Sequence, residues 1–157
     1  MMKLYHGSNT SFEKVDLRLG RPNKDFGRGF YLTDIRSQAA DMAQRRANVG
    51  GGTPVVLTFL FDESVLKSGA LKVKIFETVS EEWAQFIIAN RKHGRQAKHD
   101  YDIVVGPIAD DGVVMQIDRY LNHMIDMPTL VRELTYRKLN RQYFFGTEKA
   151  LQYLTML

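Results

Sequence analysis

The chain contains no cysteine among its 157 residues. Disulfide bonds, thiol catalysis and thiolate metal sites are therefore excluded. No apolar run approaches the roughly 18 residues that a membrane helix requires, and the first residues lack the apolar stretch of a signal peptide. From these absences we expect a cytoplasmic protein that makes no contact with a membrane.

Linkers and repeats are missing as well. No segment rich in proline, glycine or serine divides the chain, and no internal repeat or low-complexity segment is visible. A chain of this length suits one domain, so we expect a single domain over residues 1–157. Apolar residues make up 44% of the chain, which is enough for a hydrophobic core.

The net charge is only mildly basic, at +4 with a pI near 9.3. This balance leaves nucleic-acid binding open as an alternative. The lysines and arginines are scattered, however, as is typical of solvated helix surfaces. A mild positive charge also suits a ligand that carries a pyrophosphate.

Periodicity predicts an irregular mixture of strands and helices. Alternating or β-branched segments predict strands over residues 2–6, 29–33, 55–61, 71–75, 102–107 and 142–145. Apolar residues at helical spacing predict helices over 35–46, from Ser80 to before His93, near 112–125 and 128–138, and from Thr147 onward. Because no steady βαβ alternation is present, we expect an α+β fold rather than a doubly wound sheet.

Signals for metal sites and for nucleophilic catalysis are weak. The four histidines form no H-x-H or H-x-x-x-H pair. Asp100 with Asp102, and Asp110 with Asp111, are close enough in sequence for a Mg²⁺ site, but helix capping and turns are the commoner roles of such residues. The chain also lacks a G-x-S-x-G elbow and a P-loop lysine, so we expect no metal and no hydrolase triad.

Two glycine-containing segments stand out, Leu4 to Ser8 and Asp25 to Thr33. Glycine removes side-chain bulk and lets backbone amides approach a flat ligand. His6 precedes Gly7, and Tyr31 follows Gly29 closely. Taken singly, each would more often be a structural residue. Together they are consistent with one nucleotide pocket.

These segments resemble motifs of ADP-ribosyltransferases. Leu4 to Ser8 is similar to the His-Gly-Ser/Thr strand of the diphtheria-toxin-like and poly(ADP-ribose) polymerase branch. Phe26 to Asp34 resembles the Phe-Gly-Lys-Gly-Ile-Tyr-Phe-Ala-Asp stretch of those enzymes. Arg141 to Phe145 is similar to their third motif strand, with Gln142 at the glutamate position.

The resemblance implies an ADP-ribosyltransferase-like fold of split antiparallel sheets with flanking helices, and NAD as co-substrate. His6 would bond the adenosine ribose, Gly7 would meet the nicotinamide amide, and Tyr31 would pack beside nicotinamide. The implied catalytic residues are His6, Tyr31 and Gln142. The implied cofactor-binding residues are His6, Gly7, Ser8, Gly29, Phe30, Tyr31 and Met42.

Two positions depart from the pattern of that branch. Met42 stands where the polymerases have a second tyrosine over nicotinamide. Gln142 can still bond a ribose hydroxyl but supplies no negative charge. A carboxylate about 5 Å from the cationic transition state would stabilise it by roughly 3 kcal/mol at an effective dielectric near 20, or about a hundredfold in rate. Glu148 is either a substitute for that charge or a first-turn helix residue.

The whole chain also resembles a bacterial family of unknown function, number 3990. The shared segments include Asp100 to Asp111 and Thr147 to Leu151. That resemblance implies an ADP-ribosyltransferase-like toxin with a small antitoxin partner. The implied activity is mono-ADP-ribosylation of a protein or nucleic acid, or NAD hydrolysis, with a non-catalytic NAD or ADP-ribose-binding module as the alternative. Loops around Arg18 to Lys24 and Lys92 to His99 would select the acceptor.

Overall fold

Two β-sheets form the centre of the computed structural model, which describes residues 1–92, 99–137 and 139–157. The first sheet contains, in spatial order, β1 (Met2–Ser8), β3 (Val55–Phe61) and β7 (Leu154–Met156), all antiparallel. The second contains β2 (Phe30–Leu32), β6 (Arg141–Phe145), β5 (Ile103–Pro107) and β4 (Val73–Ile75). β4 runs parallel to β5, so the second sheet is mixed.

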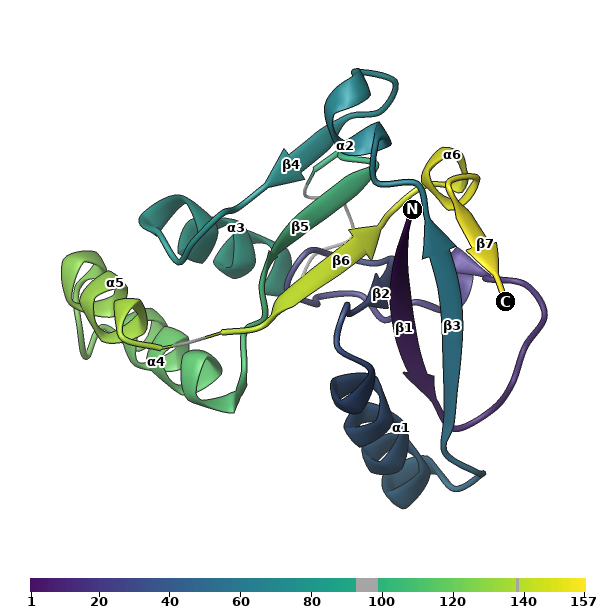
Figure 1. Cartoon of the computed structure of the whole chain (residues 1–157). Coiled ribbons are helices and arrows are strands. Elements are labelled where there is room, and N and C mark those ends of the chain that lie inside the picture. The colour runs from purple at the N-terminus through teal and green to yellow at the C-terminus, as the bar shows by residue number, and fades with distance from the viewer. Residues whose placement is uncertain (93–98, 138) are drawn as a thin grey trace.

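The two sheets meet where β1 passes β2 (Figure 1). Tyr5 and Thr33 exchange two backbone hydrogen bonds there, with N···O distances of 2.8 and 2.9 Å. The contact is a single bridge rather than a continuous ladder. The strands therefore diverge beyond it, and side chains from both sheets face the same space.

The longer helices form two groups, one below the first sheet and one to the left of the second sheet in the view of Figure 1. α1 (Arg36–Gly50) packs on β1 and β3. α3 (Glu81–Arg91), α4 (Asp111–Leu121) and α5 (Met127–Thr135) gather beside the second sheet. Short helical turns are η1 (Leu17–Leu19), α2 (Val65–Ser68) and α6 (Glu148–Leu151). Among the described residues, no helix has the length and apolar character needed to cross a bilayer.

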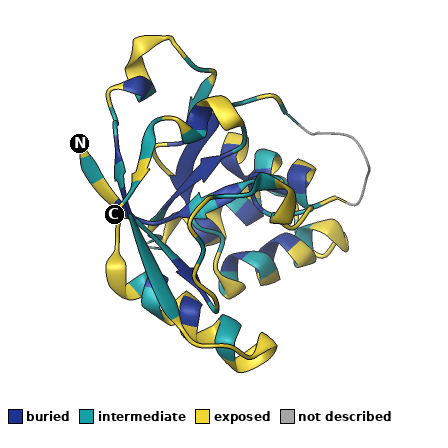
Figure 2. Ribbon diagram, turned by 90° about the vertical axis from the view of Figure 1, so that its right-hand side faces the viewer, coloured by how far each residue is buried: buried dark blue, intermediate teal, exposed yellow. Residues whose placement is uncertain are grey.

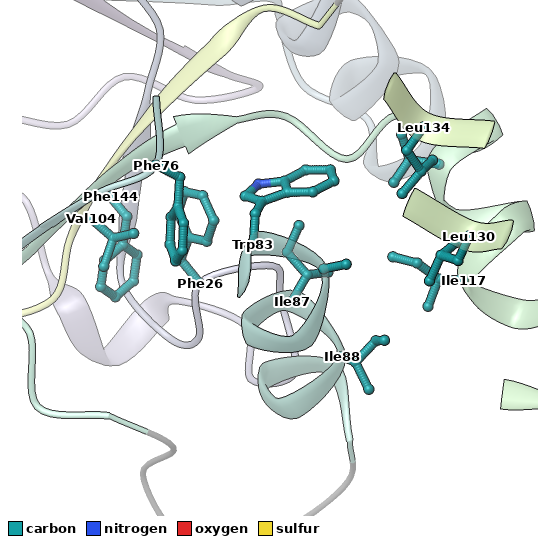
Figure 3. Packing of buried hydrophobic residues seen from close by; sticks show 12 residues of the cluster. Phe26, Phe76, Trp83, Ile87, Ile88, Val104, Ile117, Leu130, Leu134 and Phe144 are labelled. Atoms are coloured by element: carbon teal, nitrogen blue, oxygen red, sulfur yellow. The ribbon is translucent and has the colours of Figure 1, made fainter. Parts of the chain in front are cut away.

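Strict alternation along β6 divides the core into two clusters. Tyr143 and Phe145 pack toward the first sheet with Leu4, whereas Phe144 packs toward the helices. On the helix side Phe144 meets Phe26, and the cluster continues through Trp83 to α4 and α5 (Figure 3). The central strands are buried, while loops and outer helix faces are exposed (Figure 2). Gln142 therefore shares the helix-facing side of β6 with Phe144.

Most of the expected architecture is confirmed, including the α+β class. The strands form two separate sheets flanked by helices, as expected; the first sheet is antiparallel, and the second is mixed because β4 pairs with β5 in parallel. The helix expected near 112–125 ends at Leu121, where Asn122 caps it, and the one expected over 128–138 ends at Thr135. β7 and α2 were not expected. Most of the predicted acceptor loop, residues 93–98, lies outside the described residues.

Candidate functional site

A cleft of about 560 Å³ opens where β1 and β2 diverge. Its walls come from β1, the loop before β2, α1, the last residue of α3, the loop after β5, and the start of β6. Cavities of this size hold small organic ligands. Of the site residues predicted from the sequence, five line it: His6, Gly7, Tyr31, Met42 and Gln142.

His6 is held in one tautomer by the backbone of β2. Its Nδ1 lies 2.7 Å from the carbonyl oxygen of Tyr31, which can only accept, so the proton of the neutral ring sits on Nδ1. Burial lowers the pKa of His6 from 6.5 to about 4, and repulsion by Arg46 and Lys24 adds to the effect, while the bond to Tyr31 opposes it. The neutral ring thus retains Nε2 as a hydrogen-bond acceptor.

Tyr31 is anchored by its hydroxyl group to the loop that precedes β2. The hydroxyl donates to the carbonyl of Gly27 at 2.6 Å and accepts from the amide of Phe26 at 3.0 Å. Burial raises the pKa of the phenol, so it stays protonated. Its ring, 5.2 Å from the ammonium of Lys24, is the part that lines the cleft. Tyr31 therefore offers a ring surface to a ligand, not an acid or base.

Gln142 is buried in the cleft beside a carboxylate. Its Nε2 donates to Oδ2 of Asp25 at 3.2 Å. Asp25 is also buried, and its Oδ1 accepts from Nε and Nη2 of Arg91 at 2.8 and 2.6 Å. Both nitrogens of Arg91 contact the same oxygen, and such charge-assisted contacts are stronger than hydrogen bonds between neutral groups. The three side chains form a connected polar network.

Besides the pair of Asp25 and Arg91, three cations and the two carboxylates of Asp110 and Asp111 line the cleft. Lys24, Arg45 and Arg46 line it, and none of them has a carboxylate partner among the ion pairs of residues 1–92, 99–137 and 139–157. Burial lowers the pKa of Lys24 and of Arg46, with like-charge repulsion as the next cause in each. This small excess of positive charge favours an anionic ligand over a cationic one.

Gly7 has a packing role in addition to its place in the cleft. A Cβ at Gly7 would lie 2.0 Å from the carbonyl oxygen of Ala39 and 2.8 Å from the amide nitrogen of Ala43. Only glycine lets α1 approach β1 this closely. The approach brings Met42, on the next turn of α1, to the cleft wall.

Three predicted cofactor-binding residues do not line the cleft. Ser8 is buried at the end of β1, where its Oγ accepts from the amide of Thr10. Phe30 faces the opposite side of β2 from Tyr31 and packs on His6, with ring centroids 4.4 Å apart. Gly29 packs against the ring of Phe144, because a Cβ at Gly29 would lie 2.2 Å from a carbon of that ring. Their contribution to the site is indirect.

The sequence interpretation missed the polar network and considered a different carboxylate. Glu148 lies in the exposed first turn of α6 and does not line the cleft. Asp25 does, at the start of the glycine-containing segment. Its place in that segment was the only sign in the sequence that Asp25 belongs to the site. Its partners in the polar network could not be recognised, because Arg91 lies 66 residues away and Gln142 lies 117 residues away.

The part of the chain that the structure describes has no cluster of side chains suited to a metal ion. No group of three or more histidine or carboxylate side chains gathers there to hold a metal ion. Asp110 caps α4 by accepting from the amide of Val113, and Asp102 accepts from the amide of Lys72 and from the hydroxyl of Thr147. One aspartate of each acidic pair, Asp110 and Asp102, thus has a structural role.

A family model described as "Protein of unknown function (DUF3990)" matches residues 2–156, so the chain belongs to this family. Searches of curated proteins and of solved structures found no match.

Proposed function

We propose that this member of the DUF3990 family binds NAD in the cleft and transfers ADP-ribose from it to a protein or nucleic acid. The observation that carries the proposal is the convergence of His6, Tyr31 and Gln142, from three different strands, on one cleft. His6 and Tyr31 match the ADP-ribosyltransferase motifs in order, and Gln142 stands at the glutamate position of the third motif.

Each group in the cleft suits one part of the dinucleotide. Nε2 of neutral His6 accepts from a ribose hydroxyl. The ring of Tyr31 and the thioether of Met42 give apolar surface for a flat base. Lys24 and Arg46 supply positive charge for the pyrophosphate.

The proposed reaction breaks the bond between C1′ of the nicotinamide ribose and the ring nitrogen. Nicotinamide leaves with the bonding electron pair, and an acceptor oxygen or nitrogen of the macromolecule attacks C1′ and loses its proton. With water in place of the acceptor, the same step is NAD hydrolysis. Gln142 would hold the ribose hydroxyl, and the buried carboxylate of Asp25 lies next to it.

A second candidate is a module that holds NAD or ADP-ribose without cleaving it. The amide at Gln142 favours it, because an amide provides no charge for a cationic transition state. Both candidates use the same cleft. They differ only in turnover.

Labelled NAD incubated with the purified protein and a cell lysate separates these candidates. Label transfer or nicotinamide release that is lost in Gln142→Ala supports the transferase. Binding of NAD by calorimetry with no label transfer and no nicotinamide release supports the module. Failure of NAD to bind would refute both.

A further inference from the structure

Asp25 is a buried carboxylate whose two oxygens are both occupied. Oδ1 accepts from the guanidinium of Arg91. Oδ2 accepts from the backbone amide of Ala109 at 3.3 Å and from Nε2 of Gln142 at 3.2 Å. Each of these contacts is with a donor.

This arrangement determines which end of the Gln142 side chain faces the ligand. An ionised carboxylate accepts and cannot donate, so the amide must present Nε2 to Asp25. The carbonyl oxygen Oε1 is then the end of the carboxamide left for the cleft that Gln142 lines. A glutamine without such a neighbour could turn either end toward a ligand.

We propose that Asp25, clamped by Arg91, is a positioning residue that holds Oε1 of Gln142 toward the cleft as the acceptor for a ligand hydroxyl. That the hydroxyl belongs to a ribose of NAD rests on the proposed function. The amide at position 142 is thus the complement of the carboxylate at position 25. A glutamate at position 142 would face a like charge.

The experiment exchanges the carboxylate at position 25 and the carboxamide at position 142. Four proteins are compared: wild type, Asp25→Asn, Gln142→Glu, and the double variant. In Asp25→Asn, the side-chain oxygen of the asparagine keeps its contact with the charged guanidinium of Arg91. The NH₂ group then takes the place of Oδ2, so two donors, this NH₂ group and Nε2 of Gln142, face each other. In the double variant that NH₂ group donates to the carboxylate introduced at position 142, so this one hydrogen bond is restored with reversed direction. The amide of Ala109 faces the NH₂ group in Asp25→Asn and in the double variant alike, so the two differ only at position 142.

Calorimetric titration with NAD measures the effect. Each single variant is expected to lose about tenfold in affinity, and the double variant is expected to bind NAD more tightly than either single variant, although the lost bond from Ala109 keeps it below wild type. Losses that multiply in the double variant would overturn the pairing, as would Asp25→Asn binding like wild type. Asp118→Asn, an exposed change of the same charge on α4, controls for net charge.

A second measurement does not depend on NAD. The side-chain NH₂ signal of Gln142 in ¹⁵N NMR is expected to be protected from hydrogen exchange in wild type, and to lose that protection in Asp25→Asn but not in Asp118→Asn. An unchanged signal in Asp25→Asn refutes the positioning role. If wild type fails to bind NAD while the signal behaves as expected, the proposed function falls and the positioning role stands.

Discussion

Mild acid is expected to destabilise the protein through His6. The imidazole is buried between β1 and β2, where it packs on Phe30 and bonds the carbonyl of Tyr31. Burial, reinforced by Arg46 and Lys24, lowers its pKa to about 4. The unfolded chain has no such environment, so there His6 binds a proton at a higher pH than in the folded protein.

The sign and size of the effect follow from this difference. Between the unfolded pKa of 6.5 and the folded pKa of about 4, the unfolded state binds more protons, so stability falls as the pH falls. The loss from this one group is about 2 kcal/mol between about pH 7 and 5, and about 3 kcal/mol by about pH 4. Marginal stabilities of about 5–15 kcal/mol make such a loss easy to measure.

Urea denaturation followed by circular dichroism, repeated across this pH range, measures the free energy of unfolding. His6→Asn removes the titration while its side-chain NH₂ group keeps a donor near the carbonyl of Tyr31. The variant is less stable at neutral pH because the ring packing is lost. Between about pH 7 and 5, however, its free energy of unfolding should fall by about 2 kcal/mol less than that of wild type.

His123→Asn is the matched control. His123 is exposed in a turn with φ of 60°, a conformation that asparagine tolerates. Its pH profile should run parallel to that of wild type. If the profiles of wild type and His6→Asn were parallel instead, His6 would not be held neutral by the fold, and its assignment as an acceptor in the cleft would be refuted.

Two further predictions concern packing and charge. Gly29→Ala should lower the free energy of unfolding by about 3 kcal/mol, because its Cβ would lie 2.2 Å from a ring carbon of Phe144 and 2.6 Å from the carbonyl of Phe145. Arg46→Gln should weaken NAD binding about tenfold without lowering the melting temperature, since the charge of Arg46 is partly buried and repelled by Arg21.

Each of these predictions has a control of the same chemistry. Gly50→Ala adds the same methyl group at the end of α1, where the nearest atom is a side-chain nitrogen of Asn9 at 3.3 Å, and should change stability little. Arg36→Gln removes an exposed charge from the start of α1, away from the cleft. Equal effects of Gly29→Ala and Gly50→Ala, or of the two arginine changes, would contradict the reasoning.

Local patterns in the sequence were sufficient for most elements of the fold. The alternation of β6 and the capping residues Ser80 and Thr147 depend on near neighbours, and the structure has both N-caps in place. β7 could not be predicted in this way. Its three residues carry little strand signal of their own, and they are extended because β3 offers a free edge.

The residues of the candidate site also divide into those that a local sequence pattern predicts and those that it does not. His6 and Tyr31 lie in short motifs that a sequence displays directly, and Gln142 follows from the last strand. Asp25 and Arg91 were missed because their contact joins a loop to the end of a helix far along the chain. Phe30 was assigned to the site only for its place beside Tyr31, and strand alternation turns it to the other face.

The charges in the cleft favour tight binding over fast chemistry. A lone carboxylate beside Gln142 would offer the oxocarbenium-like transition state roughly 3 kcal/mol at about 5 Å. The carboxylate of Asp25 is present, but Arg91 lies 2.6 Å from it and cancels much of its field. Lys24, Arg45 and Arg46 outnumber Asp110 and Asp111 along the rest of the lining, so the net charge around the cleft stays positive. Under the proposed function, this net charge would stabilise the anionic dinucleotide and oppose the cation formed when nicotinamide leaves. Turnover by this protein should therefore be slow even where its affinity for NAD is high.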